Sequence, residues 1–275
     1  MKLAAIVIVY NPNVKSFIFN LEKLRGNVDK IVLYQNSILD VETREYCDLY
    51  GNIVVIGDGR NVGIGSALNS GIKFLNEEDF THVLTLDQDS YFKDDHLKKF
   101  INLIYNFKEN NIGVFAPNFS NRGELLVNNS KEPFEESDAI TSGSIFPLGI
   151  FDLVGGFNEN LFIDTVDQEF CYRIKRDFGL KTIIFPSIEL IHELGYPLKI
   201  MFGLTTQNYS SFRTYYLVRN HILLWKNYPK FYKKEYKLNL IKNYILYRIV
   251  KIILGEIDKS NKIKSIFKGV YHGLK

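Results

Sequence analysis

Leu84-Thr85-Leu86-Asp87-Gln88-Asp89-Ser90 combines the end of an apolar segment with two carboxylates that are one residue apart. The residues from His82 to Leu86 predict a buried strand. Alternate residues of an extended chain point the same way, so Asp87 and Asp89 are expected to face one ligand. Two such carboxylates repel unless a cation lies between them, and oxygen ligands suit Mg²⁺ or Mn²⁺ with a diphosphate completing the shell. Because Asp-x-Asp is common, an acidic turn after a strand is the alternative interpretation.

The segments around this stretch alternate between strand and helix patterns. Strands are predicted over residues 3–9, 29–34, 53–56, 112–116, 139–146, 181–186 and 188–191, and helices over residues 14–24, 40–50, 66–75 and 95–108. The polar residues 117–137 are expected to form an exposed hairpin or a flexible loop. Such alternation is typical of an open, wound α/β sheet, whose ligands lie beyond the carboxyl ends of the strands. The polar residues at those ends are therefore predicted to converge on one site, and they are Asn11, Gln35, Asn36, Ser37, Asp58, Asp87 and Asp89.

A dinucleotide site is the first alternative for such a sheet. Gly63-Ile64-Gly65 follows a predicted strand and opens a predicted helix, as the fingerprint requires. However, Leu68 occupies the third glycine position and no strand-terminal acid follows about 20 residues later. A GxxxxGK[ST] phosphate loop is also missing from the sequence. These features disfavour a nicotinamide or flavin enzyme.

A second informative segment runs from Phe162 to Arg173 and contains three acids. Apolar residues recur every fourth position from Val166, which predicts that a helix begins there, with Thr165 and Gln168 forming a capping box. Asp167 then lies in the first helical turn, where the helix dipole favours the ionised form that a general base needs. Alternatively, Asp164, Asp167 and Glu169 only reflect the usual preference for acids at a helix start. A single histidine such as His192 is more often packed or solvated than a ligand.

The charge distribution divides the chain into an acidic body and a basic end. Residues 1–195 carry 18 basic and 28 acidic side chains, whereas residues 196–275 carry 16 basic and 3 acidic ones. Two distant cysteines, Cys47 and Cys171, indicate a reducing compartment and no disulfide framework or zinc site. The apolar run from Leu3 to Tyr10 is too short for a signal peptide or a membrane span.

The basic end combines lysines and aromatic residues with apolar residues at helical spacing. A helix is predicted from Arg213 to Trp225, and an apolar stripe follows from Ile241 to Ile253. This pattern fits a helix that lies in a membrane interface, and it equally fits a helix that packs onto the body. Basic patches with aromatics also bind single-stranded nucleic acid, but the apolar stripe favours lipid or packing.

These residues together resemble family 2 glycosyltransferases of the GT-A fold, most closely bacterial rhamnosyltransferases of surface polysaccharide assembly. The matching pieces keep their order over roughly residues 3–220, and they are Val9-Tyr10-Asn11-Pro12, Asn61-Val62-Gly63-Ile64-Gly65, Ala67-Leu68-Asn69, Leu86-Asp87-Gln88-Asp89-Ser90, Thr141-Ser142-Gly143-Ser144, Gly155-Gly156-Phe157, Phe162-Ile163-Asp164, Val166-Asp167 and Arg219-Asn220. The resemblance implies a Rossmann-like wound mixed sheet over residues 1–204. It further implies a basic, aromatic-rich helical region over residues 205–275.

The resemblance also assigns roles to individual residues. It implies a Mg²⁺ or Mn²⁺ site at Asp87, Asp89 and His192, and a general base at Asp167. The implied donor-binding residues are Val9, Tyr10, Asn11, Gln35, Asn36, Asn61, Gly63, Asn69, Asp87 and Gln88, and those on the acceptor side are Thr141, Ser142, Gly143 and Asp164. The family usually has Asp-Asn where this chain has Gln35-Asn36. A neutral amide still pairs with a pyrimidine edge, so the identity of the base stays open.

The implied activity is an inverting, metal-dependent transfer of L-rhamnose from dTDP-L-rhamnose onto a glycan or a polyprenyl-linked glycan. Another donor, such as UDP-glucose or UDP-galactose, is the alternative within the same chemistry. A non-catalytic module that binds nucleotide sugars or glycans is the alternative from another class. The expected location is the cytoplasm, with peripheral contact to the inner face of the membrane through the C-terminal region and no nucleic-acid partner.

Overall fold

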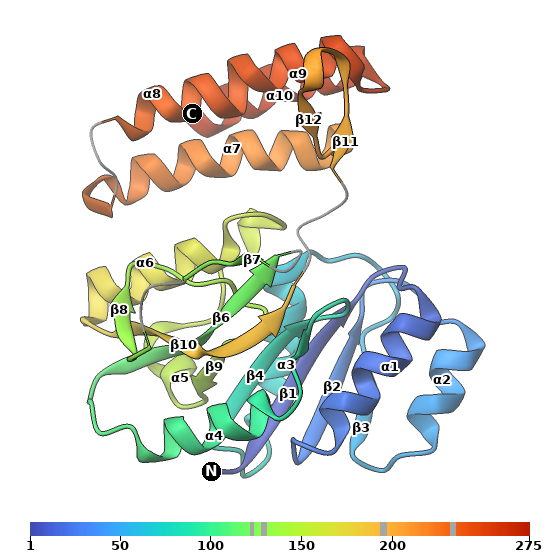
Figure 1. Ribbon diagram of the computed structural model, residues 1–275, viewed down its shortest axis with the longest axis vertical. Helices are drawn as coiled ribbons and strands as arrows, with labels where there is room; N and C mark the ends of the chain where they lie inside the picture. Colours follow the sequence, from blue (N-terminus) through green and yellow to red (C-terminus); the bar gives the residue numbers. More distant parts are fainter. Residues whose placement is uncertain (122–123, 128–130, 193–196, 232–234) are drawn as a thin grey trace. The chain divides into compact units, whose positions relative to one another are not determined.

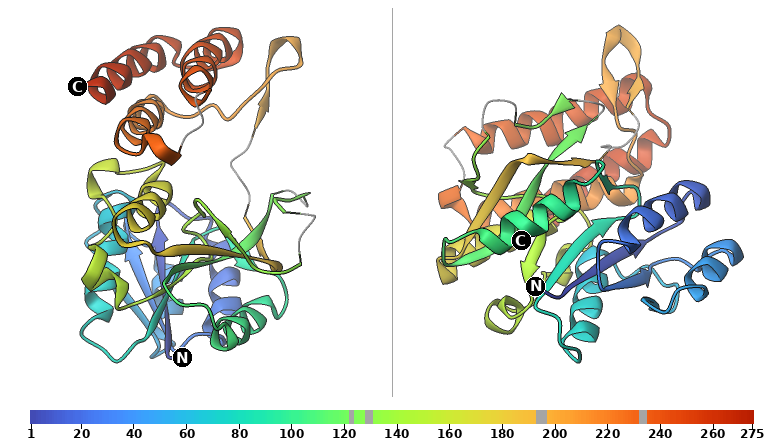
Figure 2. Two further views of the ribbon diagram at one scale, coloured as in Figure 1. Left: turned by 90° about the vertical axis from the view of Figure 1, so that its left-hand side faces the viewer. Right: turned by 60° about the horizontal axis from the view of Figure 1, so that its bottom comes forward.

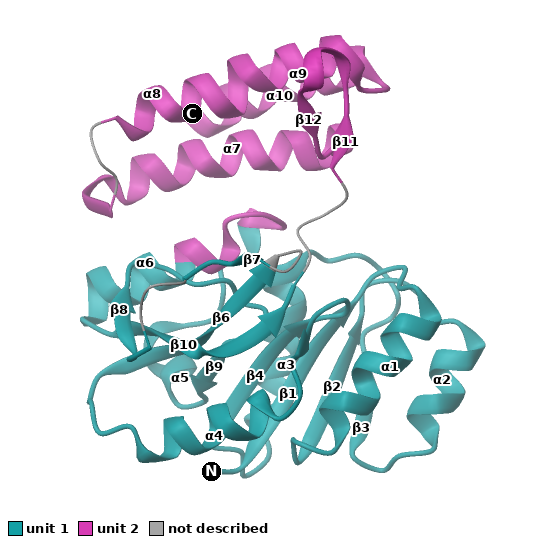
Figure 3. Ribbon diagram, in the orientation of Figure 1, with its two compact units in different colours: residues 1–160, 170–193 teal, residues 161–169, 194–275 magenta. Residues whose placement is uncertain are grey.

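The computed structural model describes residues 1–121, 124–127, 131–192, 197–231 and 235–275. The chain forms two compact units (Figure 3). The N-terminal unit contains residues 1–160 and 170–193, and the C-terminal unit contains residues 161–169 and 194–275. The short segment 161–169 therefore belongs with the C-terminal helices although most of its sequence neighbours do not.

Most strands belong to one sheet of the N-terminal unit (Figure 1). The strands are β1 (Leu3–Val9), β2 (Lys30–Gln35), β3 (Ile53–Ile56), β4 (His82–Asp87), β5 (Tyr91–Phe92), β6 (Ile112–Asn121), β7 (Glu124–Leu125), β8 (Phe134–Glu136), β9 (Ile145–Pro147), β10 (Lys181–Ile191), β11 (Leu198–Lys199) and β12 (Thr205–Thr206). The order in the sheet is β3-β2-β1-β4-β9-β6-β10-β5. The pairs β3–β2, β2–β1, β1–β4 and β6–β10 are parallel, whereas β9 is antiparallel to both β4 and β6. The sheet is therefore mixed and mostly parallel, as predicted.

Helices cover both faces of this sheet. The helical elements are α1 (Val14–Arg25), α2 (Val41–Asp48), α3 (Ile64–Leu75), α4 (His96–Asn106), α5 (Ile150–Val154), η1 (Glu159–Leu161), α6 (Val166–Phe178), η2 (Met201–Gly203), α7 (Ser211–Asn227), η3 (Pro229–Phe231), α8 (Tyr236–Leu240), η4 (Ile241–Leu246), α9 (Tyr247–Gly255) and α10 (Lys259–Leu274). Ala5 and Val7 of β1 belong to the same core as Phe17 and Leu21 of α1. On the opposite face, a Cβ at Gly71 of α3 would lie 2.8 Å from Ile6, so glycine permits the close approach.

The predicted strands and helices of residues 3–116 are confirmed to within a few residues. The strand predicted over 139–146 is wrong, because only Ile145–Pro147 pairs in the sheet. Gly143 adopts a φ of 80° and turns the chain before that strand. The two strands predicted over 181–186 and 188–191 are one strand, β10, with a register shift between Phe185 and Glu189.

The polar segment 117–137 is only partly the exposed hairpin that its composition predicts. A β6–β7 hairpin forms, with Ser120 paired to Leu125, and residues 122–123 and 128–130 lie outside the described residues. The expectation is wrong for Asn118, which is fully buried. Its side chain bonds the backbone N–H and C=O of Val127, at 3.1 and 2.8 Å, so this polar residue is satisfied within the fold.

The C-terminal unit contains α7, α8, η4, α9 and α10 together with the β11–β12 hairpin (Figures 1 and 2). Its core includes Val218 and Ile222 of α7 with Ile252 of α9 and Ile266 of α10. The helix predicted from Arg213 is confirmed as α7, and the apolar stripe of residues 241–253 is helical. Ile252 of that stripe packs into this core of the C-terminal unit, whereas packing onto the body and contact with a membrane both stay predictions.

Candidate active site

The carboxyl ends of three neighbouring parallel strands bring the predicted polar residues together. In the register of the sheet, Asp87 at the end of β4 lies opposite Ile8 of β1, and Val9 lies opposite Gln35 of β2. The residues that follow β1 and β4 therefore lie at the same edge, as the alternation of elements predicts.

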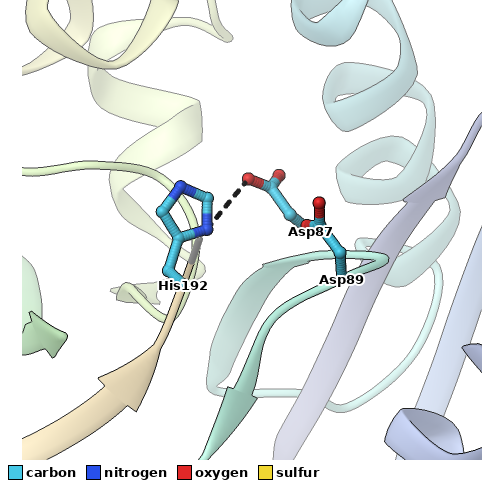
Figure 4. Close-up of side chains that lie close together, drawn as sticks. All are labelled: Asp87, Asp89 and His192. Carbon is cyan, nitrogen blue, oxygen red and sulfur yellow. Dashed lines mark ion pairs between the residues drawn. The ribbon is translucent and has the colours of Figure 1, made fainter. Parts of the chain in front are cut away.

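Asp87, Asp89 and His192 form a cluster at this edge (Figure 4). One ligand atom from each residue lies within 4.8 Å of the other two. His192 Nδ1 lies 3.8 Å from Asp87 Oδ2. Two carboxylates and one imidazole are a suitable donor set for Mn²⁺ or Mg²⁺, so the residues present fit the predicted metal. His192 immediately follows β10, which explains how a residue so distant in sequence joins the carboxylates.

Two serines position this cluster. The buried Ser90 hydroxyl lies 2.7 Å from His192 Nδ1, and Ser142 Oγ accepts a hydrogen bond of 3.1 Å from the backbone N–H of Asp87. The Phe119 ring packs edge-on against the imidazole, with centroids 6.1 Å apart. Contacts of this kind orient metal ligands. Sequence reasoning gave Ser90 no role, although its position directly after Asp89 was the available signal.

The loop of residues 141–144 is joined to β4 at several points. Thr85 donates from Oγ1 to the Thr141 carbonyl at 2.5 Å, and the Gly143 N–H donates to the Thr85 carbonyl at 2.7 Å. These bonds hold Thr141, Ser142 and Gly143 directly beside the strand that ends in Asp87.

Gln88 bonds the backbone of Tyr10. Its Oε1 accepts from the Tyr10 N–H at 2.7 Å, and its Nε2 donates to the Tyr10 carbonyl at 3.1 Å. Asn11 follows with a φ of 45°, and its N–H donates to Ser37 Oγ at 2.8 Å. The Tyr10 ring is left half exposed at the sheet edge, at 50%, so it is available to a ligand.

The amides after β2 hold the neighbouring loop. Gln35 donates from Nε2 to the Gly57 carbonyl at 2.8 Å and accepts from Arg44 Nη2 at 3.0 Å. The buried Asn36 accepts from the Val62 N–H at 3.1 Å. The charged residue Arg44 of α2, which contacts Gln35, was not predicted from the sequence, because its helix contains no site motif.

The same loop contains further predicted residues. Asn61 Oδ1 accepts from the Gly63 N–H at 3.1 Å, and Gly63 has a φ of 85° that favours glycine. Hydrogen bonds from the Arg60 backbone and side chain hold the pKa of the exposed Asp58 carboxyl below its usual range. Asp58 is therefore ionised and engaged by Arg60 at the edge of the loop.

Asn69 joins α3 to the Gly155-Gly156-Phe157 turn. Its Nδ2 donates to the Phe157 carbonyl at 2.9 Å, and its Oδ1 accepts from the Phe157 N–H at 2.7 Å. A Cβ at Gly156 would lie 2.3 Å from that Oδ1, which explains the glycine. Asn69 also donates to Glu159 at 2.8 Å.

Asp164 and Asp167 lie in the C-terminal unit, in a segment with an unusual backbone. Phe162, Asp164 and Thr165 have φ values of 62°, 61° and 61°, which non-glycine residues rarely adopt. Asn220 of α7 donates to three carbonyls of this segment, those of Leu161, Ile163 and Asp164, at 2.8, 2.7 and 3.1 Å. Strained backbone that is held by a buried side chain is a feature of functional segments.

Charged contacts fix the same segment. The Asp164 carboxylate pairs with Arg213 of α7 at 2.9 Å. The half-buried Asp167 lies in the first turn of α6, and its Oδ1 accepts from the Gln168 N–H at 2.9 Å. The predicted capping box is wrong, because Thr165 is left-handed. Its buried Oγ1 has no hydrogen-bond partner in the part of the chain that the structure describes.

Comparisons with known proteins agree with the fold. A model of glycosyl transferase family 2 matches residues 5–149. The chain is 26% identical over 283 residues to the dTDP-rhamnosyl transferase RfbF of Shigella flexneri, which covers 97% of this chain and 92% of that protein. The structure of GalNAc-T7 with UDP, GalNAc and Mn²⁺ superposes with a TM-score of 0.61 at 15% identity over 91% of this chain and 57% of that one. The structure of S. aureus TarS 1-349 with UDP-GlcNAc gives 0.58 at 15% identity over 99% and 81%.

Proposed function

Because the chain belongs to glycosyl transferase family 2 and has the GT-A fold, we propose that it transfers L-rhamnose from dTDP-L-rhamnose to a hydroxyl of a glycan or lipid-linked glycan. The observation that carries this proposal is the Asp87–Asp89–His192 cluster at the carboxyl edge of the sheet. The name and near full-length match of RfbF favour rhamnose among the sugars. We also propose that residues 1–204 act as the catalytic region and residues 205–275 as a basic C-terminal region.

In this proposal Asp87, Asp89 and His192 hold Mg²⁺ or Mn²⁺. When bound, the cation would act as a Lewis acid that offsets negative charge on the departing nucleoside diphosphate. Ser90 and Ser142 keep the imidazole and the Asp87 backbone in position for that role. The structure of GalNAc-T7 with UDP, GalNAc and Mn²⁺ supports a metal for a protein of this fold.

The nucleoside half of the donor would lie against the loops after β1, β2 and β3. The proposed contacts are Val9, Tyr10, Asn11, Gln35, Asn36, Asn61, Gly63, Asn69, Asp87 and Gln88. An amide offers two N–H donors and two oxygen lone pairs. Gln35 uses one of each on Gly57 and Arg44, so one donor and one acceptor remain for a pyrimidine edge.

Asp167 is the proposed general base on the acceptor. The acceptor hydroxyl loses its proton to the Asp167 carboxylate while its oxygen bonds to the anomeric carbon. The bond from that carbon to the diphosphate oxygen breaks on the opposite face, so the configuration inverts. We place Thr141, Ser142, Gly143 and Asp164 on the acceptor side.

A panel of nucleotide sugars tests the donor assignment. With Mn²⁺ present, dTDP-L-rhamnose should raise the melting temperature of the full chain more than UDP-glucose, UDP-galactose or UDP-GlcNAc at equal concentration, because a true donor stabilises the fold by mass action. Preference for a UDP sugar would overturn the rhamnose assignment. A chain that binds a donor but never releases nucleoside diphosphate from it, with or without acceptor, would instead be a binding module.

We further propose a cytoplasmic enzyme that meets its acceptor at an anionic membrane surface. In the C-terminal unit, Met201 and Phe202 at the tip of the β11–β12 hairpin are 58% and 81% exposed, and Ile253 and Ile257 near the end of α9 are 52% and 74% exposed. A Cβ at Gly255 would lie 2.4 Å from Ile200, so the hairpin and this helix end adjoin. Exposed apolar side chains among lysines fit a lipid interface. Within the described residues, no helix is long and apolar enough to cross a membrane.

Flotation with vesicles tests the membrane contact. The full chain should float with vesicles of phosphatidylglycerol and phosphatidylethanolamine, and the Phe202→Asn, Ile257→Asn variant should float less. Asparagine tolerates the left-handed φ of 59° at Phe202, so the hairpin is retained. The control is Leu153→Asn, a residue of α5 that is 60% exposed. Equal flotation of all three proteins would remove this part of the proposal.

A further inference from the structure

The C-terminal unit contains a hollow of about 200 Å³ that shares no residue with the Asp87–Asp89–His192 cluster. Its walls come from the β11–β12 hairpin and the loop after it, from α7, from η4 and from α9. The lining residues are Pro197, Thr205, Thr206, Gln207, Tyr209, Leu217, Asn243, Tyr244, Arg248 and Lys251. Six of these ten residues are Thr, Gln, Asn, Arg or Lys, and their side chains can bind a small polar group.

The charged groups joined to the lining residue Arg248 do not balance. Glu256 is completely buried and is paired with Arg248 and with Lys262, the latter at 2.8 Å. The side chains of Arg248 and Lys262 are only 8% and 2% exposed, so two buried cations share one carboxylate. Lys251 adds a further cation to the wall, and no acidic residue is among the lining residues that the structure describes. A buried excess of positive charge is costly without an anion, so the site favours a negatively charged ligand.

Two polar atoms of the lining residues lack partners. Gln207 Oε1 and Arg248 Nε are both buried and make no hydrogen bond to the described parts of the chain. Buried polar atoms in native proteins nearly always have a partner, so each one requires an explanation. The oxygen needs a donor such as a hydroxyl, and the guanidinium N–H needs an acceptor such as a phosphate oxygen.

The backbone at this site is also unusual. Residues Ile241–Leu246 form a π-helix between α8 and α9, and Asn243 and Tyr244 of that π-helix line the hollow. π-helical turns are rare and occur frequently at functional sites. This feature is independent of the charges and of the unpartnered atoms.

From these observations we propose that the hollow binds the phosphate group of a phosphorylated saccharide. Arg248 and Lys251 would meet the phosphate, and Gln207 would accept a hydrogen bond from a sugar hydroxyl. The volume is smaller than the ~300 Å³ of the smaller drug sites, so one sugar ring with its phosphate is the appropriate scale. The phosphate can come from a soluble sugar phosphate or from a lipid-linked glycan.

Calorimetry on the full chain tests this site with glucose 1-phosphate as the probe. Glucose 1-phosphate should bind, whereas glucose at the same concentration should not. Lys251→Ala should weaken binding about tenfold or more, as expected for a lost hydrogen bond to a charged group. The control Lys242→Ala removes the same charge from an exposed position outside the lining and should bind like the unchanged chain. No binding of glucose 1-phosphate, or equal binding by Lys251→Ala, would overturn the proposal.

Gln207→Leu provides a second variant whose folding is not in question. It removes a buried oxygen without a partner, so the melting temperature should stay or rise while affinity for glucose 1-phosphate falls. A variant that binds as tightly as the unchanged chain would contradict the assigned hydroxyl contact.

Two further arms identify the source of the phosphate and separate this site from the donor site. If vesicles with phosphatidylinositol compete with glucose 1-phosphate and vesicles of phosphatidylcholine do not, a lipid-linked phosphate is supported. If neither kind of vesicle competes, a soluble sugar phosphate is supported. The Asp87→Asn, Asp89→Asn variant should retain glucose 1-phosphate binding. Loss of binding in that variant would place the probe in the donor site and reject the hollow, whereas failure of rhamnose transfer alone would leave this result unchanged.

Discussion

Ser90 shows how a residue without a charge can control the chemistry of the site. Its buried hydroxyl lies 2.7 Å from His192 Nδ1 and thereby fixes the ring that faces Asp87 and Asp89. A hydrogen-bond partner on a ring nitrogen fixes the orientation of an imidazole. The site therefore depends on positioning residues as much as on the three proposed ligands.

Removing this hydroxyl should loosen the metal without unfolding the chain. Ser90→Ala is expected to weaken Mn²⁺ binding in the presence of dTDP by about 10–100-fold, as second-sphere substitutions commonly do. Titration calorimetry measures the change. Ser70→Ala is the control, since that hydroxyl bonds the Ser66 carbonyl within α3, and it should bind Mn²⁺ normally. Unchanged Mn²⁺ affinity in Ser90→Ala would remove Ser90 from the site.

At the scale of single residues, the sequence predicted the strand-end side chains but not their partners. Asp87, Asp89 and Gln35 follow apolar runs, and that local pattern placed them at one edge. His192 could not be assigned from its own surroundings, since its partner Ser90 lies 102 positions away along the chain. Gln88 likewise bonds the Tyr10 backbone through a pairing that only the β1–β4 register creates.

Among the elements, α7 has the largest influence on the segment that contains Asp167. Asn220 is fully buried and donates to three carbonyls of residues 161–164, while Arg213 pairs with Asp164. Those contacts hold the left-handed residues Phe162, Asp164 and Thr165 in place. The element therefore determines where the first turn of α6, with Asp167, begins.

Asn220→Ala should destabilise this segment. Loss of the amide leaves buried carbonyls without a donor, and we expect the free energy of unfolding to fall by at least ~2 kcal/mol. Urea unfolding measures it. Asn102→Ala, an exposed position of α4, is the matched control and should change stability by less than ~0.5 kcal/mol. A loss of the same small size in Asn220→Ala would show that other contacts hold the segment.

Buried His221 of α7 should make the C-terminal unit sensitive to acid. Burial lowers its pKa to about 4 from an ordinary value of 6.5, and its Nδ1 lies 2.9 Å from the Tyr236 hydroxyl. Between pH 6.5 and 4 the unfolded chain therefore binds a proton that the folded chain does not, so stability falls as the pH falls. The expected loss between pH 7.5 and 5 is about 2 kcal/mol.

The single tryptophan, Trp225, reports this change because it lies on the same helix. Urea unfolding followed by its fluorescence should show the loss in the unchanged chain and little of it in His221→Leu. If the unchanged chain were equally stable at pH 7.5 and pH 5, His221 would not be the buried neutral group described.

The elements also show where local sequence patterns fail. The Thr165–Gln168 pair matches a capping box, yet contacts from α7 hold Thr165 in a left-handed conformation that prevents the cap. Residues 139–144 have strand-like composition, but Gly143 turns the chain and their polar groups bond Thr85. In both cases tertiary contacts outweigh the local conformational preference of the residues. Such contacts cannot be seen in a local sequence pattern.

The whole molecule separates an acidic sheet unit from a basic helical unit. In the sequence, the charge changes from acidic to basic near residue 195. The longer segment of the C-terminal unit begins at almost the same point, at residue 194. Residues 161–169 are the exception, since they are distant in sequence from the C-terminal helices yet belong to that unit. Long-range contacts from Asn220 and Arg213 explain this membership, and composition gave no sign of it.

Our central proposal is that Asp167 acts as the general base on the acceptor, in a transfer from a donor held by Asp87, Asp89 and His192. The most direct test is one measurement on Asp167→Asn, which compares dTDP-L-rhamnose affinity with the rate of transfer in the presence of Mn²⁺. Our account predicts donor affinity within about threefold of the unchanged chain and a kcat lower by about 10²–10⁴-fold, the usual contribution of a general base. Turnover within about tenfold of the unchanged chain would contradict it.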